Sequence, residues 1–143
     1  MSMSKPYKIG RGLCIFINNV VFGERIGDSE SFSECRIRLG AGHDTTKITE
    51  AIKHLDMKFI YKENLKASDI EKLLNEYRDL VNSKKDAYHS LIVIISSHGD
   101  EGIILGTDEN PVDVRTKIVK PFHNTMCTGL QGSPKIFIIN ACR

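Results

Sequence analysis

Three short runs of apolar, mostly β-branched residues place the tightest constraint on what this chain can fold into. They cover residues 13–17, 91–95 and 136–139, and each ends at polar residues. A strand with one solvent-exposed face alternates between apolar and polar residues, and none of these runs does. The runs therefore predict strands covered on both faces, as in a parallel sheet. Residues 58–61 predict a weaker strand.

Helical patterns separate these runs. From Ser68 onwards apolar residues recur at helical spacing as far as Val81, and Ser68 with Glu71 has the form of a capping box. We therefore expect a helix that begins at Ser68. A second helical pattern follows Asp44. The residues expected on its apolar face are Ile48, Ala51, Ile52 and Leu55.

The order of these elements predicts an α/β fold. Strands joined by helices of this length imply right-handed βαβ crossovers and a mainly parallel sheet. Residues 102–114 predict a small hairpin at the periphery of the fold. In such sheets functional groups gather beyond the carboxyl ends of the strands, which selects residues 97–99 and 140–142 as site candidates.

Composition narrows the class of protein. The 143 residues suit one globular domain, and a net charge of +2 gives no sign of a nucleic-acid or membrane partner. No apolar run has the length of a membrane span. The cysteines at 14, 35, 127 and 142 form no CxxC pair, so neither a disulfide scaffold nor a zinc site is expected. We expect a reducing, cytoplasmic compartment.

Cys142 and His98 are the residues best suited to nucleophilic catalysis. A thiol attacks as the thiolate, and a neighbouring imidazole can take up its proton and later return it. The two residues lie 44 positions apart, at the ends of two strands that a parallel sheet can make neighbours. Without further support, Cys142 as a packing residue and His98 as a strand end would be the commoner case.

Four motifs in order supply that support. The segments RGLCIFINN, RLG followed by Asp44, SHGDEG and NACR occur in this sequence at residues 11–19, 38–44, 97–102 and 140–143. Together they strongly resemble the large subunit of a caspase over nearly the whole chain. The resemblance implies a three-layer caspase-like α/β fold whose mainly parallel sheet is flanked by helices and completed by a small subunit. Residues 1–10 would form an N-terminal tail, and residues 11–143 a large-subunit domain truncated just after the nucleophile.

The resemblance also implies a role for each site residue. Cys142 matches the nucleophile and His98 the catalytic histidine, and the backbone N–H groups of Gly99 and Cys142 would form the oxyanion hole. Arg38 matches a basic residue that binds the aspartate of the substrate. Asn140 stands where the family has Gln, lines the same pocket and is one methylene shorter. No metal and no organic cofactor are implied.

Two functions remain open on these grounds. The resemblance implies an aspartate-directed cysteine endopeptidase of apoptosis, made as a zymogen. Its partners would be a small subunit from the same precursor, a second heterodimer or a homologous caspase, and protein substrates with Asp at the cleavage site. Asn140 motivates the alternative, a weakly active or inactive homologue that binds and regulates another caspase. An unrelated flavodoxin-like signalling domain would explain the sheet but leave the four motifs as coincidence.

Overall fold

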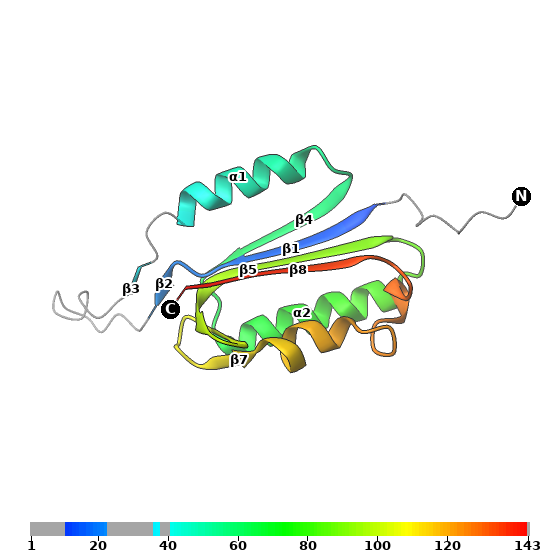
Figure 1. Cartoon of the computed structure of the whole chain (residues 1–143). Coiled ribbons are helices and arrows are strands. Elements are labelled where there is room, and N and C mark those ends of the chain that lie inside the picture. Colours follow the sequence, from blue (N-terminus) through cyan, green and yellow to red (C-terminus); the bar gives the residue numbers. More distant parts are fainter. Residues whose placement is uncertain (1–10, 23–35, 38–40, 143) are drawn as a thin grey trace, which may run out of the picture.

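The chain folds into three layers. A computed structural model describes residues 11–22, 36–37 and 41–142, and in it the sheet lies between α1 on one face and α2 with the turns that follow β7 on the other (Figure 1). The predicted α/β class is confirmed. The elements are β1 (Gly12–Asn18), β2 (Val21–Phe22), β3 (Arg36–Ile37), α1 (Ala41–Lys53), β4 (Met57–Glu63), α2 (Ala67–Ser83), β5 (Ser90–Asp100), β6 (Ile103–Leu105), β7 (Pro111–Asp113), the π-helical turn η2 (Val114–Val119), the 3-10 turns η3 (Lys120–Phe122) and η4 (Thr128–Leu130), and β8 (Lys135–Cys142).

The sheet is parallel at its centre. The strands β4, β1, β5 and β8 pair in that order, and all three pairings are parallel, as expected of strands joined by helical crossovers. The eleven-residue strand β5 continues past this parallel region and pairs antiparallel with β6, which in turn pairs with β7. The short strands β2 and β3 form a separate antiparallel pair. β5 therefore contacts β1, β8 and the β6–β7 hairpin.

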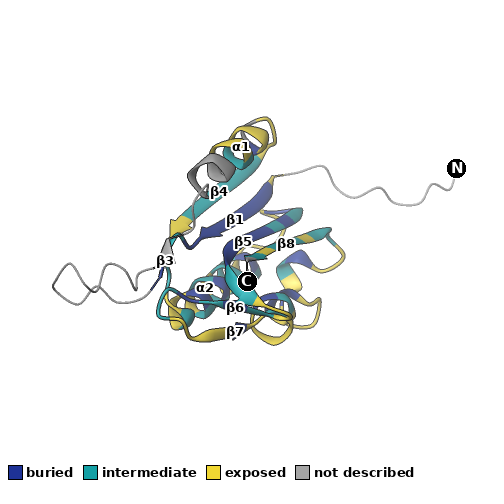
Figure 2. Cartoon of the chain, turned by 60° about the vertical axis from the view of Figure 1, so that its left-hand side comes forward, coloured by how far each residue is buried: buried dark blue, intermediate teal, exposed yellow. Residues whose placement is uncertain are grey.

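β1 shows why the central runs lack alternation. Its residues Leu13, Ile15 and Ile17 belong to the buried cluster that α2 covers, and Cys14 and Phe16 belong to the cluster that α1 covers. All five are at most 1% exposed. Burying a large apolar side chain stabilises a fold by about 1.5–3 kcal/mol, so both faces of β1 contribute. Figure 2 shows β1 and most of β5 as the most buried strands.

β8 was predicted to be covered on both faces, but the structure covers only one of them. Phe137 and Ile139 pack against the cluster on the α2 side. Ile136 and Ile138 are 51% and 49% exposed. The prediction was wrong for this face because α1 lies over β4 and β1 (Figure 1), and no described element covers the same face of β8. This strand carries an apolar surface with no cover from the described residues.

The start of α2 differs from the capping-box prediction. The helix begins at Ala67 with Lys66 at the N-cap position, so Ser68 lies inside the first turn. The N–H of Ala67 donates to Oδ1 of Asp108 at 3.2 Å. A carboxylate from the hairpin thus caps the helix in place of a local hydroxyl. The capping-box interpretation was wrong because a residue 41 positions further along the chain supplies the cap.

The helix expected after Asp44 is present as α1 but begins at Ala41, so Asp44 lies within it. Ile52 is buried against the sheet and Ile48 packs beside it. Leu55 lies beyond the end of the helix and is 52% exposed, so it does not extend the apolar face. None of the described helices is long and apolar enough to cross a membrane.

The predicted hairpin over residues 102–114 is confirmed as β6 and β7. It is not peripheral, however, because Ile104 and Val112 are buried in the cluster that α2 covers. The hairpin therefore seals one end of the core, beside the carboxyl end of β5.

Candidate functional site

The register of β5 against β8 joins the two selected strand ends. Cα partners along this pairing include Ser96 with Asn140, Ser97 with Ala141, and His98 with Cys142. Hydrogen-bonded strands lie about 4.8 Å apart, so each pair consists of direct neighbours. The prediction that a parallel sheet brings His98 and Cys142 together is confirmed for their backbone positions.

The imidazole of His98 packs against an aromatic ring. The centroids of the Phe22 and His98 rings lie 4.4 Å apart, and the ring planes are tilted by 60°. Phe22 belongs to β2 and is fully buried. β2 and the end of β8 lie at the same end of the sheet in Figure 1. An apolar ring therefore bounds the imidazole of His98.

Gly99 occupies a position with no room for a side chain. A Cβ added there would lie 2.3 Å from the carbonyl oxygen of Ile103 and 3.1 Å from the Cβ of Ala141. The first distance is far inside van der Waals contact with backbone. Glycine at this position lets β5 approach β6 closely next to the end of β8, and the main chain of residue 99 stays uncovered by a side chain of its own.

The side chain of Asn19 links several segments at the carboxyl ends of β1 and β5. The side chain of Asn19 is fully buried. Its Oδ1 accepts from the N–H of Leu65 at 2.8 Å. Its Nδ2 donates to the carbonyl oxygens of Leu65 and Leu105, both at 3.3 Å, and to Oγ of Ser97 at 3.4 Å. The end of β1 is thereby tied to β5 at the residue before His98, to β6 and to the loop before α2.

Asn19 and Phe22 were missed as functional candidates in the sequence. Asn19 was counted only as part of a motif that closes a strand. The signals that could have singled them out are a polar residue at the carboxyl end of a central strand and an aromatic residue three positions later. Neither signal reveals the contact with β5, because that contact depends on the fold.

Of the two residues predicted to bind the substrate aspartate, Asn140 lies within the described residues and Arg38 does not. Asn140 lies near the end of β8 and is exposed, two residues before Cys142. Arg38 lies outside the described residues. The strand that precedes it, β3, pairs with β2 so that Arg36 is the Cα partner of Phe22.

The other described cysteines are packing residues. Cys14 is fully buried in β1, and burial raises the pKa of its thiol to about 11. Burial also raises the pKa of the Cys127 thiol. A thiol with a raised pKa holds little thiolate at neutral pH and is a poor nucleophile. Neither cysteine competes with Cys142 as the candidate nucleophile.

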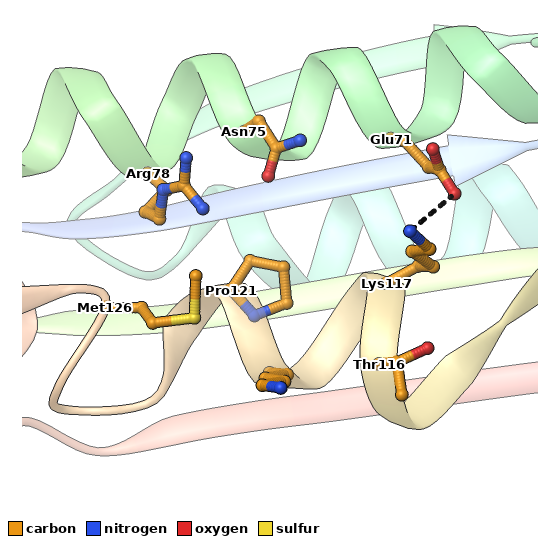
Figure 3. A pocket seen from close by; sticks show the side chains of 8 residues that line it. Glu71, Asn75, Arg78, Thr116, Lys117, Pro121 and Met126 are labelled. Carbon is orange, nitrogen blue, oxygen red and sulfur yellow. Dashed lines mark ion pairs between the residues drawn. The ribbon is translucent and has the colours of Figure 1, made fainter.

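Two further features lie apart from the strand ends. Within the described residues no group of three or more His, Cys, Asp or Glu side chains is placed to hold a metal ion. A hollow of about 290 Å³ lies between α2 and the turns η2 and η3 (Figure 3). Across it Glu71 pairs with Lys117 at 3.9 Å, and Arg78 on its rim pairs with Asp79 at 3.1 Å.

Comparison with known proteins gives one family. The caspase domain matches residues 11–143. The chain is 33% identical to caspase-8 of Rattus norvegicus over 140 residues, which cover 98% of this chain and 27% of that protein. It is 33% identical to caspase-3 of Bos taurus over 146 residues, covering 100% of this chain and 49% of that protein. Caspase-3 of Felis catus is 35% identical over 144 residues, covering 99% of this chain and 48% of that protein. The chain thus spans about a quarter to a half of the length of these relatives.

Proposed function

The chain belongs to the caspase family, and on that premise we propose that it is the large catalytic subunit of an aspartate-directed cysteine endopeptidase that acts in apoptosis. The observation that carries the proposal is the register of β5 against β8. It makes His98 and Cys142 Cα partners at the carboxyl ends of two parallel strands. Functional groups gather at that edge in open α/β sheets.

In the first half of the proposed reaction, the imidazole of His98 takes the thiol proton of Cys142. The thiolate attacks the main-chain carbonyl carbon of the aspartate at the cleavage site, and a C–S bond forms. Charge collects on the carbonyl oxygen, and the N–H groups of Gly99 and Cys142 stabilise it. The imidazolium then gives its proton to the leaving nitrogen, the C–N bond breaks, and an acyl-enzyme remains.

In the second half, His98 removes a proton from water, and the resulting hydroxide attacks the thioester. The C–S bond breaks, the new carboxyl group leaves, and the proton held by the imidazole returns to the sulfur of Cys142. Protons and electron pairs balance over the cycle without a cofactor. The close approach at Gly99 supports this assignment, because it keeps side-chain atoms away from the main chain at residue 99.

The aspartate preference is assigned to Arg38 and Asn140. A guanidinium presents a planar pair of donors that matches a carboxylate, so Arg38 supplies the charge-assisted contact. Asn140 lies exposed near the end of β8, where its amide is available for hydrogen bonding. Its side chain is one methylene shorter than the Gln of the family, which weakens the second contact.

That short amide also favours the second candidate function, a weakly active or inactive homologue that binds and regulates another caspase. Such a protein would act by binding its partner through the surfaces of the sheet, and it would not need to hydrolyse a substrate. The retention of both His98 and Cys142 favours the enzyme, because a pure binding protein has no chemical need for the pair.

We assign the bare face of β8 to a small subunit cut from the same precursor. β8 pairs with β5 and with no other described strand, so one edge is open. Ile136 and Ile138 are about half exposed on it. A neighbouring hollow of about 280 Å³ is lined by Leu55, Ile92 and Ile136 among others. An open edge with an apolar face is an aggregation hazard unless covered. The relatives extend well beyond the matched length, and a precursor of their size would hold enough chain to cover it.

The decisive experiment measures peptide hydrolysis by the full-length protein. We expect fluorogenic peptides that end in aspartate to be cleaved, and peptides that end in asparagine to be cleaved far more slowly. Cys142→Ala and His98→Ala should each lower kcat by about a thousandfold or more, as loss of a catalytic unit does. An aspartate-based covalent inhibitor should label Cys142.

The matched control is Cys127→Ala, which removes a buried thiol away from the strand ends and should leave kcat within about twofold of the wild type. Absence of Cys142-dependent hydrolysis, together with absence of labelling, would refute the enzyme. Binding of another caspase by such an inert protein would establish the regulatory alternative.

A further inference from the structure

Phe22 touches the candidate catalytic base directly. Its ring centroid lies 4.4 Å from that of His98, with the planes tilted by 60°. Phe22 is fully buried, and it belongs to a strand of only two residues. So short a strand has little intrinsic stability, so neighbouring groups must hold the ring in place.

Two anchors precede Phe22 in the chain. The backbone N–H of Asn19 donates to the carbonyl oxygen of Ser96 at 2.8 Å. The side chain of Asn19 donates to Oγ of Ser97 at 3.4 Å. The start of the segment that carries Phe22 is therefore tied to the two residues just before His98, and the two rings share one framework.

Asn64 fixes the turn between β1 and β2. Its Oδ1 accepts from the backbone N–H groups of Val20 and Val21, at 2.9 and 3.0 Å. Its own N–H donates to the carbonyl oxygen of Asn18 at 3.1 Å. Asn64 adopts φ 56°, a left-handed conformation that asparagine tolerates better than most residues. A side chain from the end of β4 thus sets the direction in which the chain approaches Phe22.

Resting on the proposed peptidase function, we propose that Phe22 is a positioning residue that holds the imidazole of His98 in its reactive orientation. A flat ring packed at this distance restricts the rotation of the imidazole. A base displaced by about 1 Å can cost a hundredfold in rate, so such a restraint acts on the chemical step. It does not act on substrate binding, which falls to Arg38 and Asn140.

The competing reading is that Phe22 only fills the core, and Phe16 supplies the control for it. Phe16 lies on β1, is 1% exposed, and packs edge-to-face on Tyr61 with ring centroids 5.2 Å apart. Phe16→Leu therefore removes a buried aromatic contact of the same kind away from His98. If burial alone matters, Phe16→Leu and Phe22→Leu will affect turnover alike.

The first test compares both variants in the full-length protein, corrected for the folded fraction. Phe22→Leu should lower kcat by about ten- to a hundredfold and change KM by less than about twofold. Phe16→Leu should leave both constants within about twofold. Equal effects of the two variants, or an unchanged kcat in Phe22→Leu, would overturn the proposal. Phe22→Met, which keeps more of the buried volume, replaces Phe22→Leu if that variant does not fold.

The second test does not need turnover. In the inert Cys142→Ala background, the ring protons of His98 should sense the ring current of Phe22 in a nuclear magnetic resonance spectrum. Loss of the ring alone shifts these signals, so the readout is their line width: Phe22→Leu should broaden them as the imidazole gains rotational freedom, and Phe16→Leu should not. His98 signals that stay sharp in Phe22→Leu overturn the proposal. A protein that hydrolyses nothing but shows the broadening refutes the peptidase and still supports Phe22 as the residue that orients His98.

Discussion

His98 and Cys142 are Cα partners on the last pair of the parallel β5–β8 register. Seven residue pairs earlier the same register begins with Leu91 opposite Lys135. The pairing of two apolar strands thus determines which residues meet at the polar end. A slip of one residue would move every side chain of one strand to the opposite face and offset Cys142 from His98.

Gly99→Ala should destabilise the protein and abolish turnover. The added Cβ would lie 2.3 Å from the backbone oxygen of Ile103, so β5 and β6 must separate. We expect a loss of about 2 kcal/mol or more in the free energy of unfolding, measured by urea denaturation. Gly102→Asn is the control, because a Cβ there meets nothing within 4 Å and asparagine tolerates the φ of 72°. Equal losses in the two variants would contradict the steric argument.

Asn19→Ala should be among the most destabilising polar-to-alanine changes in the chain. It leaves the N–H of Leu65 and the carbonyl oxygen of Leu105 with fewer buried partners, at about 1–3 kcal/mol for each group left unsatisfied. Thermal or urea unfolding measures the loss. The exposed amide residue Gln131 is the comparison, and Gln131→Ala should change stability by less than about 0.5 kcal/mol. A loss at Asn19 as small as this would show that water replaces the amide.

Asn140→Gln should raise kcat/KM for peptides that end in aspartate by about tenfold or more. The longer amide reaches the substrate carboxylate, and a hydrogen bond to a charged group is worth about 1.5–3 kcal/mol. The same change should do little for peptides that end in asparagine. Unchanged turnover of the aspartate peptides would show that the short amide of Asn140 is not limiting.

Cys14 should make stability fall at alkaline pH. Its thiol has a pKa of about 11 when folded against 9.0 for the ordinary group, because burial disfavours the thiolate. The stabilisation is thus fully present below pH 9 and is lost as pH rises towards 11, and the loss by pH 11 amounts to about 2 kcal/mol. The stability difference between the wild type and Cys14→Ala, measured under reducing conditions, should shrink by this amount from pH 8 to 11. A constant difference would mean that the thiol is not ionising on unfolding.

Ile138→Ser should improve the solubility of the isolated chain and cost it little stability, because Ile138 is already 49% exposed. In the full-length protein the same change should weaken assembly with the small subunit, visible as dissociation during gel filtration. Lys62→Ser, at an exposed position of β4, is the control. Unimpaired assembly of Ile138→Ser would exclude this face from the interface.

The four parallel strands and the α/β class followed from sequence because the information is local, whereas the order in which the strands pair did not. A run such as residues 91–95 has nowhere to lie except inside a sheet covered on both faces, and polar residues at its end mark the functional edge. The turn residues between β6 and β7 likewise predicted the hairpin. His98 and Cys142 were selected by the same edge argument, but only the structure shows that their strands pair directly.

What sequence could not show depends on distant partners. The cap of α2 comes from Asp108, across 41 residues, and overrides the local Ser68 signal. The bare face at Ile136 depends on what covers β8, which no local pattern encodes. The contact between Phe22 and His98 joins segments 76 residues apart, and no local sequence pattern in either segment predicts it.

β5 pairs with the nearby β6 through a short turn, but it meets β8 only after a much longer loop has closed. Local hairpins form fast, and contacts distant in sequence form late. We therefore expect the β5–β6 hairpin to form before β8 pairs with β5, so that Cys142 arrives beside His98 late in folding. On the proposed assignment, a chain still emerging or only partly folded holds a base without a nucleophile. Incomplete molecules are then chemically silent, and proteolytic competence marks a finished fold.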